Sequence, residues 1–476
     1  MTVQRNASDI ARIFESQRAH HPTVKASPIG HRRERLEKLR AAIQRRAPEI
    51  REAIYRDFRK PAVEVDSTEI YTTLAEIDHT LRHLRTWTRP HRVPNSLALW
   101  GSRSEIRYEP KGVVLIISPW NYPFYLMMTP LISAIAAGNC CILKPSELTA
   151  HTSRFLASLI EEVFEEREVA LFEGDAAISQ HLLELPFDHI FFTGSTRVGK
   201  LVMQAAAKHL TPVTLELGGK SPAIVDESAD LRLTCERIAW GKFVNAGQTC
   251  VAPDYVLLPE SRTQEFLAEI QNVIARFYGS DEAAREKSPD FCRPVNDAHF
   301  SRLRKLTEDS LTAGARAVTG GVFRPETRYI APTVLFPAQW DHPIMREEIF
   351  GPVLPVLTYR TLEEACARVR AGDKPLSLYV YASDRARIEQ VLAQTSAGGT
   401  VINSALVHLS NAHLPFGGVG ASGIGSCHGF FGFKAFSHER AVLFARRFSI
   451  SNFLLPPYGP KVKRLVSLFL SIRLPF

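Results

Sequence analysis

The sequence lacks the features of secreted and membrane-spanning proteins. No apolar run reaches the roughly 18 residues that a membrane-spanning helix needs. Residues 1–19 mix arginines and acids in a helical pattern, where a signal peptide would have an apolar core. The 476 residues include 7 cysteines, with no CxxC pair and no closely spaced even set. These absences argue against a disulfide scaffold or a metal site and favour a reducing, cytoplasmic location.

The sequence also lacks a basic region that would predict nucleic-acid binding. The net charge is +8, but basic residues are spread along the chain, with acids interspersed. Two denser basic stretches lie at 82–107 and in the tail from Lys461. Solvated faces, or attraction of a dinucleotide's phosphates, explain this distribution. We therefore expect no nucleic-acid partner.

Two nucleotide-binding fingerprints are missing by small margins. Gly194 and Gly199 lie five residues apart, so they do not match the GxGxxG pattern. The phosphate-loop pattern fits from Gly194 to Lys200 but then has Leu201 in place of a hydroxyl. Without that magnesium ligand, ATP chemistry is disfavoured. A glycine turn that opens a helix can still bind a pyrophosphate, although a plain tight turn is the alternative.

From Gly112 onward the sequence contains buried strands that alternate with helices. The expected strands are 112–118, 140–143, 168–172 and 188–192, and the expected helices are 129–137 and 150–165. This alternation predicts a parallel, doubly wound sheet whose ligands bind beyond the strand carboxyl ends. Those ends deliver Asn121, Lys144, Glu147 and the glycine turn 193–200.

The flanking regions have different patterns. Residues 1–90 predict helices, at 31–58 with a break at Pro48 and at 69–87. A proline-rich ribbon follows, with a short strand at 104–108. Beyond residue 251 a second α/β region is expected, with strands at 254–258, 333–336, 353–359, 377–382 and 399–403 and a helix at 262–277. The glycine-rich stretch 414–425 predicts the wall of a tunnel.

Two residues suggest covalent catalysis. Cys250 follows small and polar residues, which leaves its sulfur open to a substrate, although an inert buried cysteine is the alternative. Glu216 ends an apolar strand and precedes paired glycines. Partial burial there would raise its affinity for a proton and suit a general base, whereas a salt-bridged structural role is the alternative.

Together these residues resemble the aldehyde dehydrogenase superfamily over about residues 10–445. Seven motifs occur in family order: PWNYP at 119–123, KPSE at 144–147, FTGST at 192–196, LELGGKSP at 215–222, GQTC at 247–250, EEIFGP at 347–352 and LPFGG at 414–418. Residues 246–255 and the stretches 428–429 and 436–438 are similar to the class 3 branch. That branch is dimeric and accepts medium- and long-chain or aromatic aldehydes.

The resemblance implies an α/β aldehyde dehydrogenase fold with three parts. Residues 1–90 and 111–217 would form a Rossmann-like NAD-binding domain, and residues 218–402 an α/β catalytic domain. Residues 91–110 and 403–445 would form a small β ribbon that joins the subunits, followed by a C-terminal tail at 446–476.

The resemblance also implies roles for named residues. Cys250 would attack the aldehyde, and its backbone amide and the side chain of Asn121 would receive the oxyanion. The thiohemiacetal would expel hydride to the nicotinamide, after which Glu216 would activate the water that cleaves the thioester. The implied cofactor-binding residues are Trp120, Lys144, Glu147, Gly194, Ser195, Gly199, Gly218, Glu348 and Phe350.

Cofactor, partners and alternatives follow from the same resemblance. A carboxylate at position 147 accepts ribose hydroxyls and repels a 2′-phosphate, so NAD is expected, with NADP tolerated beside Lys144. A homodimer is expected. The basic and apolar stretch at 461–472 is expected to touch a membrane surface or screen the substrate mouth, with packing on the dimer partner as the alternative. A CoA-acylating enzyme and a catalytically retired homologue are the competing functions.

Overall fold

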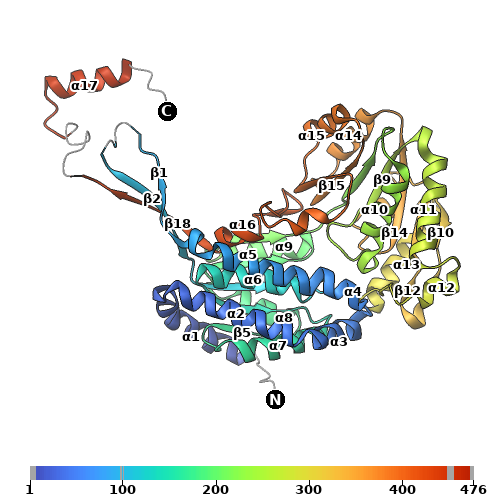
Figure 1. The fold of residues 1–476 in the computed structure, drawn as a ribbon, viewed down its shortest axis with the longest axis horizontal. Coiled ribbons are helices and arrows are strands. Elements are labelled where there is room, and N and C mark those ends of the chain that lie inside the picture. Colours follow the sequence, from blue (N-terminus) through green and yellow to red (C-terminus); the bar gives the residue numbers. More distant parts are fainter. Residues whose placement is uncertain (1–6, 97–98, 100, 447–454, 472–476) are drawn as a thin grey trace.

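The computed structural model describes residues 7–96, 99, 101–446 and 455–471, which form three regions (Figure 1). A six-stranded sheet with the N-terminal helices lies beside a seven-stranded sheet with its own helices. A three-stranded ribbon projects from the first region and leads to the C-terminal helix. This is an α/β fold with two mainly parallel sheets and a small antiparallel one.

The N-terminal region is helical, as its periodicity predicts. Pro48 occupies the first turn of a new helix and so divides the expected helix 31–58 into two. The helices are α1 (Ala7–Ala26), α2 (Ile29–Arg45), α3 (Ala47–Phe58), α4 (Ala62–Val65) and α5 (Tyr71–Thr88), with a π-helical turn at Asp66–Ile70.

The six-stranded sheet has the order β17-β7-β6-β3-β4-β5, and all neighbours are parallel except β17. Its strands are β3 (Val113–Ile117), β4 (Cys140–Lys144), β5 (Val169–Leu171), β6 (His189–Thr193), β7 (Val213–Glu216) and β17 (Gly423–Ile424). Side chains of β3 alternate between two cores: Val114 and Ile116 face the core that contains α6 (Tyr125–Ala137), and Val113 and Leu115 face the core that contains α1. The sheet is therefore covered on both faces, as predicted.

Further helices of this region are α7 (Ala150–Val163), α8 (Ala176–Leu183) and α9 (Thr196–Ala207). Helix α6 begins at Tyr125, four residues before the predicted start. Its residues are almost all buried, so it has no polar face from which a periodic pattern could mark its first turn.

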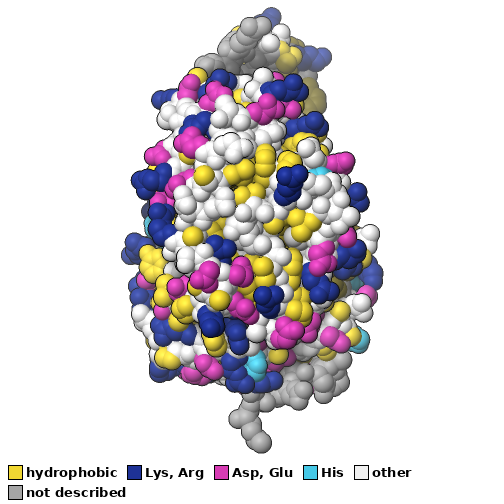
Figure 2. Space-filling model, turned by 90° about the vertical axis from the view of Figure 1, so that its right-hand side faces the viewer, with side chains coloured by type: hydrophobic (Ala, Val, Ile, Leu, Met, Phe, Trp, Pro, Cys, Tyr) yellow, Lys and Arg dark blue, Asp and Glu magenta, His cyan; other side chains and the backbone are white. Residues whose placement is uncertain are grey.

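The second region contains a seven-stranded sheet with the order β10-β13-β14-β9-β8-β15-β16. Its strands are β8 (Pro222–Val225), β9 (Tyr255–Pro259), β10 (Arg316–Thr319), β13 (Thr333–Phe336), β14 (Val353–Tyr359), β15 (Ser377–Tyr381) and β16 (Gly399–Ile402). A small hairpin pairs β11 (Phe323–Arg324) with β12 (Tyr329–Ile330). Its helices are α10 (Leu231–Phe243), α11 (Thr263–Tyr278), α12 (Glu282–Lys287), α13 (Asp297–Thr312), α14 (Leu362–Ala371) and α15 (Arg385–Gln394). Basic and acidic side chains are interspersed on the face of the molecule in Figure 2.

The ribbon brings together the two segments that were expected to bridge subunits. Strand β2 (Arg103–Pro110) pairs antiparallel with β1 (His91–Val93) and, over eight residues, with β18 (Ser437–Phe444). Helix α16 (Gly429–Ala435) precedes β18, and α17 (Pro460–Ser471) follows the ribbon. No described helix is both long and apolar enough to cross a bilayer. Parts of the expected tail, 447–454 and 472–476, lie outside the described residues.

Candidate active site

The carboxyl ends of four neighbouring parallel strands meet at one edge of the six-stranded sheet. Asn121 follows β3, Lys144 ends β4, Gly194 follows β6 and Glu216 ends β7. The turn that carries Cys250 comes from the other region, between α10 and β9, and faces this edge. The site therefore lies where the two regions meet.

Cys250 is presented by an unusual turn. Asn245, Ala246 and Gly247 have φ values of 55°, 49° and 73°, which lie in the left-handed region. Only glycine fits at 247, because a Cβ there would lie 2.3 Å from the carbonyl oxygen of Gly351. Strain of this kind persists where surrounding contacts hold it, and it is concentrated at functional sites.

Side-chain amides hold that turn in place. Asn245 Nδ2 donates to the carbonyl oxygens of Asn121 and Gln248 at 2.9 and 3.0 Å. Gln248 Nε2 donates to the oxygens of Asn245 and Arg293 at 3.0 and 3.1 Å. The motif around Cys250 is thus a rigid support for the sulfur as well as a sequence signature.

Cys250 lies on the wall of two different cavities. One, of about 190 Å³, is mainly apolar, and it is lined by Ser67, Thr68, Thr72, Tyr122, Tyr125, Leu126, Trp240, Val244, Thr249, Val251, Leu406, Val407, Leu409, Ser410, Phe416 and His428. The other, of about 200 Å³, is lined by Pro119, Trp120, Asn121, Leu126, Thr193, Gly194, Ser195, Glu216, Leu217, Gly218, His299, Arg302, Glu348 and Phe350. The one residue Cys250 therefore borders both cavities.

The environment of Cys250 keeps it a neutral thiol at rest. Burial, with the charges of Glu348 and Glu216 nearby, raises its pKa to about 12. Of the seven cysteines it is the only one that is not fully buried. The alternative of an inert core cysteine therefore does not describe it, and the sulfur needs a proton acceptor to become nucleophilic.

Glu216 is not a salt-bridged structural residue. Its side chain is only 4% exposed, and neither carboxylate oxygen has a nitrogen or oxygen partner among the described residues. Burial raises its pKa well above the ordinary value, and only the weakly donating thiol of Cys427 opposes that rise. An unpartnered carboxylate of high proton affinity in a cavity has the properties of a general base.

Asn121 is buried and lies next to the cysteine turn. Its Nδ2 donates to the carbonyl oxygen of Gln248 at 3.0 Å. A side-chain amide has two N–H groups, so one remains for a ligand. Asn121 and Cys250 line the same cavity, which brings together the two residues expected to receive an oxyanion.

Lys144 and Glu147 lie outside that cavity, farther along the sheet edge. Lys144 is buried, and its Nζ donates to the Pro145 oxygen at 2.7 Å and to Glu147 Oε2 at 3.3 Å. Burial lowers the pKa of Lys144, while Glu147 opposes that effect. The Glu147 side chain is 47% exposed, so its carboxylate is available to a ligand.

The glycine turn after β6 opens helix α9. The Gly194 amide donates to the backbone carbonyl oxygen of Glu216 at 3.0 Å, and Ser195 caps the helix by accepting from the Val198 amide. Gly199 is buried, and a Cβ there would lie 2.7 Å from Leu217 Cδ2. This glycine permits the close approach of α9 to the end of β7, and a direct cofactor contact for it stays a prediction.

Gly218, Glu348 and Phe350 lie on one side of the second cavity. A Cβ at Gly218 would lie 2.1 Å from Glu348 Oε2, so the glycine leaves room for that carboxylate. Burial and the charge of Asp254 raise the pKa of Glu348 to about 8. The rings of Phe350 and Trp120 meet edge to face, with centroids 5.3 Å apart.

Sequence reasoning missed two polar residues of this cavity, His299 and Arg302. Both come from α13, which was not predicted. Arg302 donates to Glu347 Oε1 at 2.8 Å and to the Ile349 oxygen at 2.6 Å, so it holds the loop that carries Glu348. Asn296, which caps α13 by accepting from the His299 amide, is the signal that could have revealed the helix.

The described residues contain no cluster of three or more His, Cys, Asp or Glu side chains that could hold a metal ion. The functional groups that line the second cavity include a thiol, carboxylates and a side-chain amide.

Comparison with known proteins identifies similar chains. The family model described as "Aldehyde dehydrogenase family" matches residues 2–442. The 4,4′-diaponeurosporen-aldehyde dehydrogenase of Staphylococcus aureus is 45% identical, covering 97% of this chain and 99% of that protein. Human aldehyde dehydrogenase family 3 member B1 is 43% identical, covering 92% of each chain. A substrate-bound structure of Staphylococcus aureus AldH has a TM-score of 0.93 at 45% identity and covers 97% of this chain and 99% of that one.

Proposed function

The chain belongs to the aldehyde dehydrogenase family, and we propose that it oxidises apolar aldehydes to carboxylic acids through a covalent intermediate on Cys250. The activity of this family is aldehyde oxidation with NAD(P)+. The comparisons establish this activity for the chain. We propose in addition which residues act, which aldehydes are oxidised and which of NAD+ and NADP+ is preferred.

The observation that carries the proposal is the position of Cys250 between two cavities of different character. One has apolar walls that suit the body of an aldehyde, and the other contains the predicted cofactor residues and Glu216. A nucleophile at this boundary meets both reactants without moving either of them across the site.

Catalysis begins when the Cys250 thiol passes its proton through Glu216 to solvent and the sulfur adds to the aldehyde carbon. The carbonyl oxygen becomes an oxyanion, which accepts hydrogen bonds from the Cys250 backbone amide and the second N–H of Asn121 Nδ2. Loss of one such donor typically costs ~10²- to 10³-fold in rate. Bound NAD(P)+ supplies the hydride acceptor, and oxidation leaves a thioester on Cys250. Glu216 then takes a proton from water as the hydroxyl attacks the thioester, and the carbon–sulfur bond breaks.

The residues at the sheet edge fit a dinucleotide. Lys144 and Glu147 would hold the adenosine ribose, the turn of Gly194 and Ser195 the pyrophosphate, and Glu348 and Phe350 the nicotinamide riboside. Trp120 packs against Phe350, and Gly218 leaves room for Glu348, which supports their assignment. The exposed carboxylate of Glu147 favours NAD over NADP by repelling a 2′-phosphate, with Lys144 as the residue through which NADP would be tolerated.

The apolar cavity supports medium- or long-chain aliphatic or aromatic aldehydes as substrates. Leu126, Val244, Leu406 and Phe416 contribute apolar walls, and each buried methylene of a substrate gains about 0.8 kcal/mol. A short polar aldehyde would gain little from these walls. The Staphylococcus aureus relative is named for 4,4′-diaponeurosporen aldehyde, one particular aldehyde.

The ribbon is the proposed dimer contact. Residues 438–441 and 443–444 of β18 are exposed, and a three-stranded ribbon that projects from the body has little core of its own. A second copy would cover this surface. The proposed domain limits follow the same division: 1–90 with 111–217, then 218–402, with 91–110 and 403–445 bridging.

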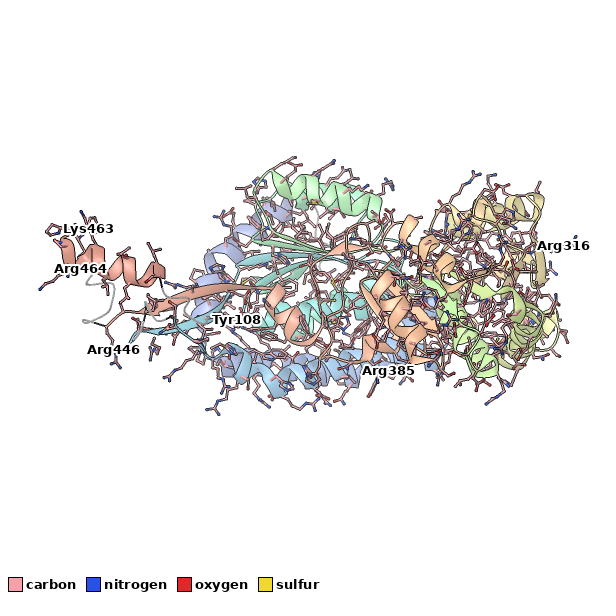
Figure 3. The ribbon with its side chains drawn as sticks, turned by 90° about the horizontal axis from the view of Figure 1, so that it is seen from above. Tyr108, Arg316, Arg385, Arg446, Lys463 and Arg464 are labelled. Carbon is pink, nitrogen blue, oxygen red and sulfur yellow. The ribbon has the colours of Figure 1, made fainter. Side chains whose placement is uncertain are left out.

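Helix α17 is proposed to touch a membrane surface. It is amphipathic: it carries Lys461, Lys463 and Arg464 together with exposed Val466 and, 84% exposed, Leu470. Figure 3 places Lys463 and Arg464 at the end of the molecule opposite Arg316. Deletion of 460–476 is expected to reduce binding to anionic vesicles. Unchanged partitioning would leave the substrate mouth or the dimer partner as the helix's contact.

One assay tests the proposed function. Purified protein is mixed with NAD+ or NADP+ and a panel of aldehydes of graded chain length and aromaticity, and reduced cofactor is followed by absorbance. Turnover without CoA that rises with apolar surface is expected, with NAD+ preferred. Turnover only with CoA would favour the acylating reaction, and none under any condition would favour a retired homologue.

A further inference from the structure

We infer that Glu69 is a positioning residue for the oxyanion site. It fixes the position of the loop that carries Asn121 without lining the site itself. The inference rests on the proposed function, because it assigns the task of that loop to catalysis. Glu69 itself lines neither of the cavities that meet at Cys250. It acts through the backbone that Asn121 belongs to.

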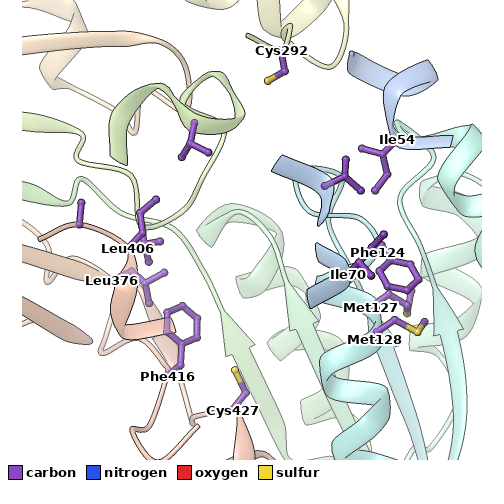
Figure 4. Close-up of a cluster of buried hydrophobic side chains, with 14 of the residues drawn as sticks. Ile54, Ile70, Phe124, Met127, Met128, Cys292, Leu376, Leu406, Phe416 and Cys427 are labelled. Carbon is purple, nitrogen blue, oxygen red and sulfur yellow. The ribbon is translucent and has the colours of Figure 1, made fainter. Parts of the chain in front are cut away.

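Glu69 binds the start of helix α6. Its Oε2 accepts from the amides of Phe124 and Tyr125 at 3.0 and 3.3 Å, three and four residues after Asn121. Its Oε1 accepts from Lys60 Nζ at 2.8 Å, and both side chains are 0% exposed. Ile70, the next residue, packs beside Phe124 in the same core, as Figure 4 shows.

Lys60 extends the support to the cysteine turn. Its Nζ lies 3.7 Å from the centroid of the Tyr122 ring, and the Tyr122 hydroxyl shares a 2.8 Å hydrogen bond with Thr249 Oγ1. Thr249 directly precedes Cys250. The two oxyanion donors are the Asn121 side chain and the Cys250 amide. Glu69 contacts the segment that follows Asn121, and Lys60 contacts Tyr122, which is hydrogen-bonded to the residue before Cys250.

The same segment reaches the strained turn by a second route. Glu64 Oε2 accepts from the Asn245 amide at 2.9 Å, at the first of the three left-handed residues. The π-helical turn Asp66–Ile70 adds a residue to the helix between Glu64 and Glu69. Such turns change the direction of the side chains that follow and are frequent at functional sites.

Stability alone does not account for this arrangement. A buried ion pair is weak evidence for stability, since the desolvation of two charges offsets much of their attraction. The contacts of Lys60 and Glu69 are directional, however. Two backbone amides fix the position of the Glu69 carboxylate, and the Tyr122 ring fixes that of the Lys60 ammonium. A misplacement of about 1 Å at such a site costs on the order of 10²-fold in rate.

The chain contains a matched control, Asp57. It too is a buried carboxylate from an N-terminal helix that accepts from two amides at the start of another helix, those of His151 and Thr152 at 3.0 and 2.9 Å. The helix that it caps, α7, contributes no residue to either cavity at Cys250. Glu69→Gln and Asp57→Asn therefore make the same kind of change in two places.

The experiment compares these variants in the full-length protein, with kcat measured at saturating cofactor and aldehyde. Both are expected to lower the unfolding temperature. Glu69→Gln is expected to lower kcat ~10- to 100-fold with KM for aldehyde and affinity for NAD+ nearly unchanged. Asp57→Asn is expected to leave kcat at saturating cofactor within about twofold, because the helix start that it binds follows the cofactor residue Glu147 and not the oxyanion donors. Equal kcat values for the two variants would overturn the inference.

Two further measurements keep the test decisive. If Glu69→Gln alone does not fold, the double variant Lys60→Met with Glu69→Gln removes both buried charges, and the same loss of kcat is expected. The rate of Cys250 alkylation by iodoacetamide needs no aldehyde, and the other six cysteines are buried. A changed rate in Glu69→Gln but not in Asp57→Asn supports the inference even if wild-type protein oxidises nothing in the panel, and equal rates oppose it.

Discussion

The two cavities that meet at Cys250 have different walls. The apolar cavity has side chains from α5, α6, α10 and the segment 406–428, whereas the other contains Glu216, Glu348 and Arg302. The first discriminates by surface area and the second by charge and hydrogen bonding. The difference shows that substrate class and cofactor choice are set by separate parts of the chain, which join at one sulfur.

Removal of that sulfur has the largest expected effect, because it disconnects the two cavities. Cys250→Ala is expected to lower kcat on the order of 10⁶-fold, as loss of other covalent nucleophiles does, and to leave NAD+ binding intact. Cys366→Ala is the control, since that buried thiol lines neither cavity. Steady-state oxidation and cofactor fluorescence measure the two effects. Retained turnover would remove the thiol from the mechanism.

Substitution of Glu216 tests the role of the second cavity in thioester hydrolysis, the step that follows hydride transfer. Glu216→Gln is expected to leave a burst of reduced cofactor and then to slow turnover ~10²- to 10⁴-fold, the usual contribution of a general base. The burial that raises its pKa also makes the carboxylate a strong proton acceptor. Stopped-flow absorbance separates the burst from the steady state. An undiminished steady state would mean that another group activates the water.

Trp240 tests the first cavity by itself. Its indole lines the apolar wall and is 41% exposed, so Trp240→Ala removes contact area without opening the core. KM for a long-chain aldehyde is expected to rise about tenfold, while KM for a short aldehyde and for NAD+ changes little. A parallel loss for all substrates would show that the two cavities are not independent.

Glu348 offers the smallest and most specific test, through pH. Its pKa is about 8 in the folded protein against an ordinary 4.5, so the folded state keeps a proton that the unfolded state releases. This group therefore contributes stability below pH 4.5 that is lost as pH rises through about 8. Urea unfolding of cofactor-free protein should show that slope, and Glu348→Gln should flatten it. An unaltered slope would assign the proton to another group.

NAD+ affinity should change in the opposite direction over the same range. The ionised Glu348 carboxylate accepts hydrogen bonds from ribose hydroxyls, so binding is expected to tighten a few-fold as pH passes about 8. Affinity for a long-chain aldehyde should not follow this titration, because Glu348 does not line the apolar cavity. A shared pH dependence would indicate that the aldehyde also reaches that carboxylate.

The strands of the parallel sheets were predictable because they are buried on both faces. Runs such as 113–117 and 140–144 are continuous and apolar, and glycines, prolines or polar residues mark their ends. Side chains that follow such strands meet at one edge by topology alone, which is why the sequence predicted that Asn121, Lys144 and Glu147 lie along one edge. The start of α6 was wrong by four residues, since a helix buried all round has no periodic polar face.

The segment 403–445 shows where reasoning from sequence was too coarse. It was predicted as a bridging segment, and its last strand, β18, does pair in the ribbon. Its earlier residues, however, pair β17 with β7 beside Glu216, and Leu406, Phe416 and His428 line the apolar cavity. The segment reaches these places by pairing with and packing on distant elements. Only its glycine-rich part, 414–425, has a local pattern that predicted a wall, and the pattern did not say of which cavity.

The sequence by itself determined the family, the alternation of strands and helices, and the identity of the thiol, the carboxylate and the amide, because these depend on residue type and local order. Tertiary structure alone decided that Cys250 faces two cavities, that Glu216 has no ion-pair partner among the residues the structure describes, and that Glu69 contacts the segment that follows Asn121. The physical reason is that burial, desolvation and the direction of a hydrogen bond depend on neighbours in space, which here lie 55 and 127 residues apart in the chain.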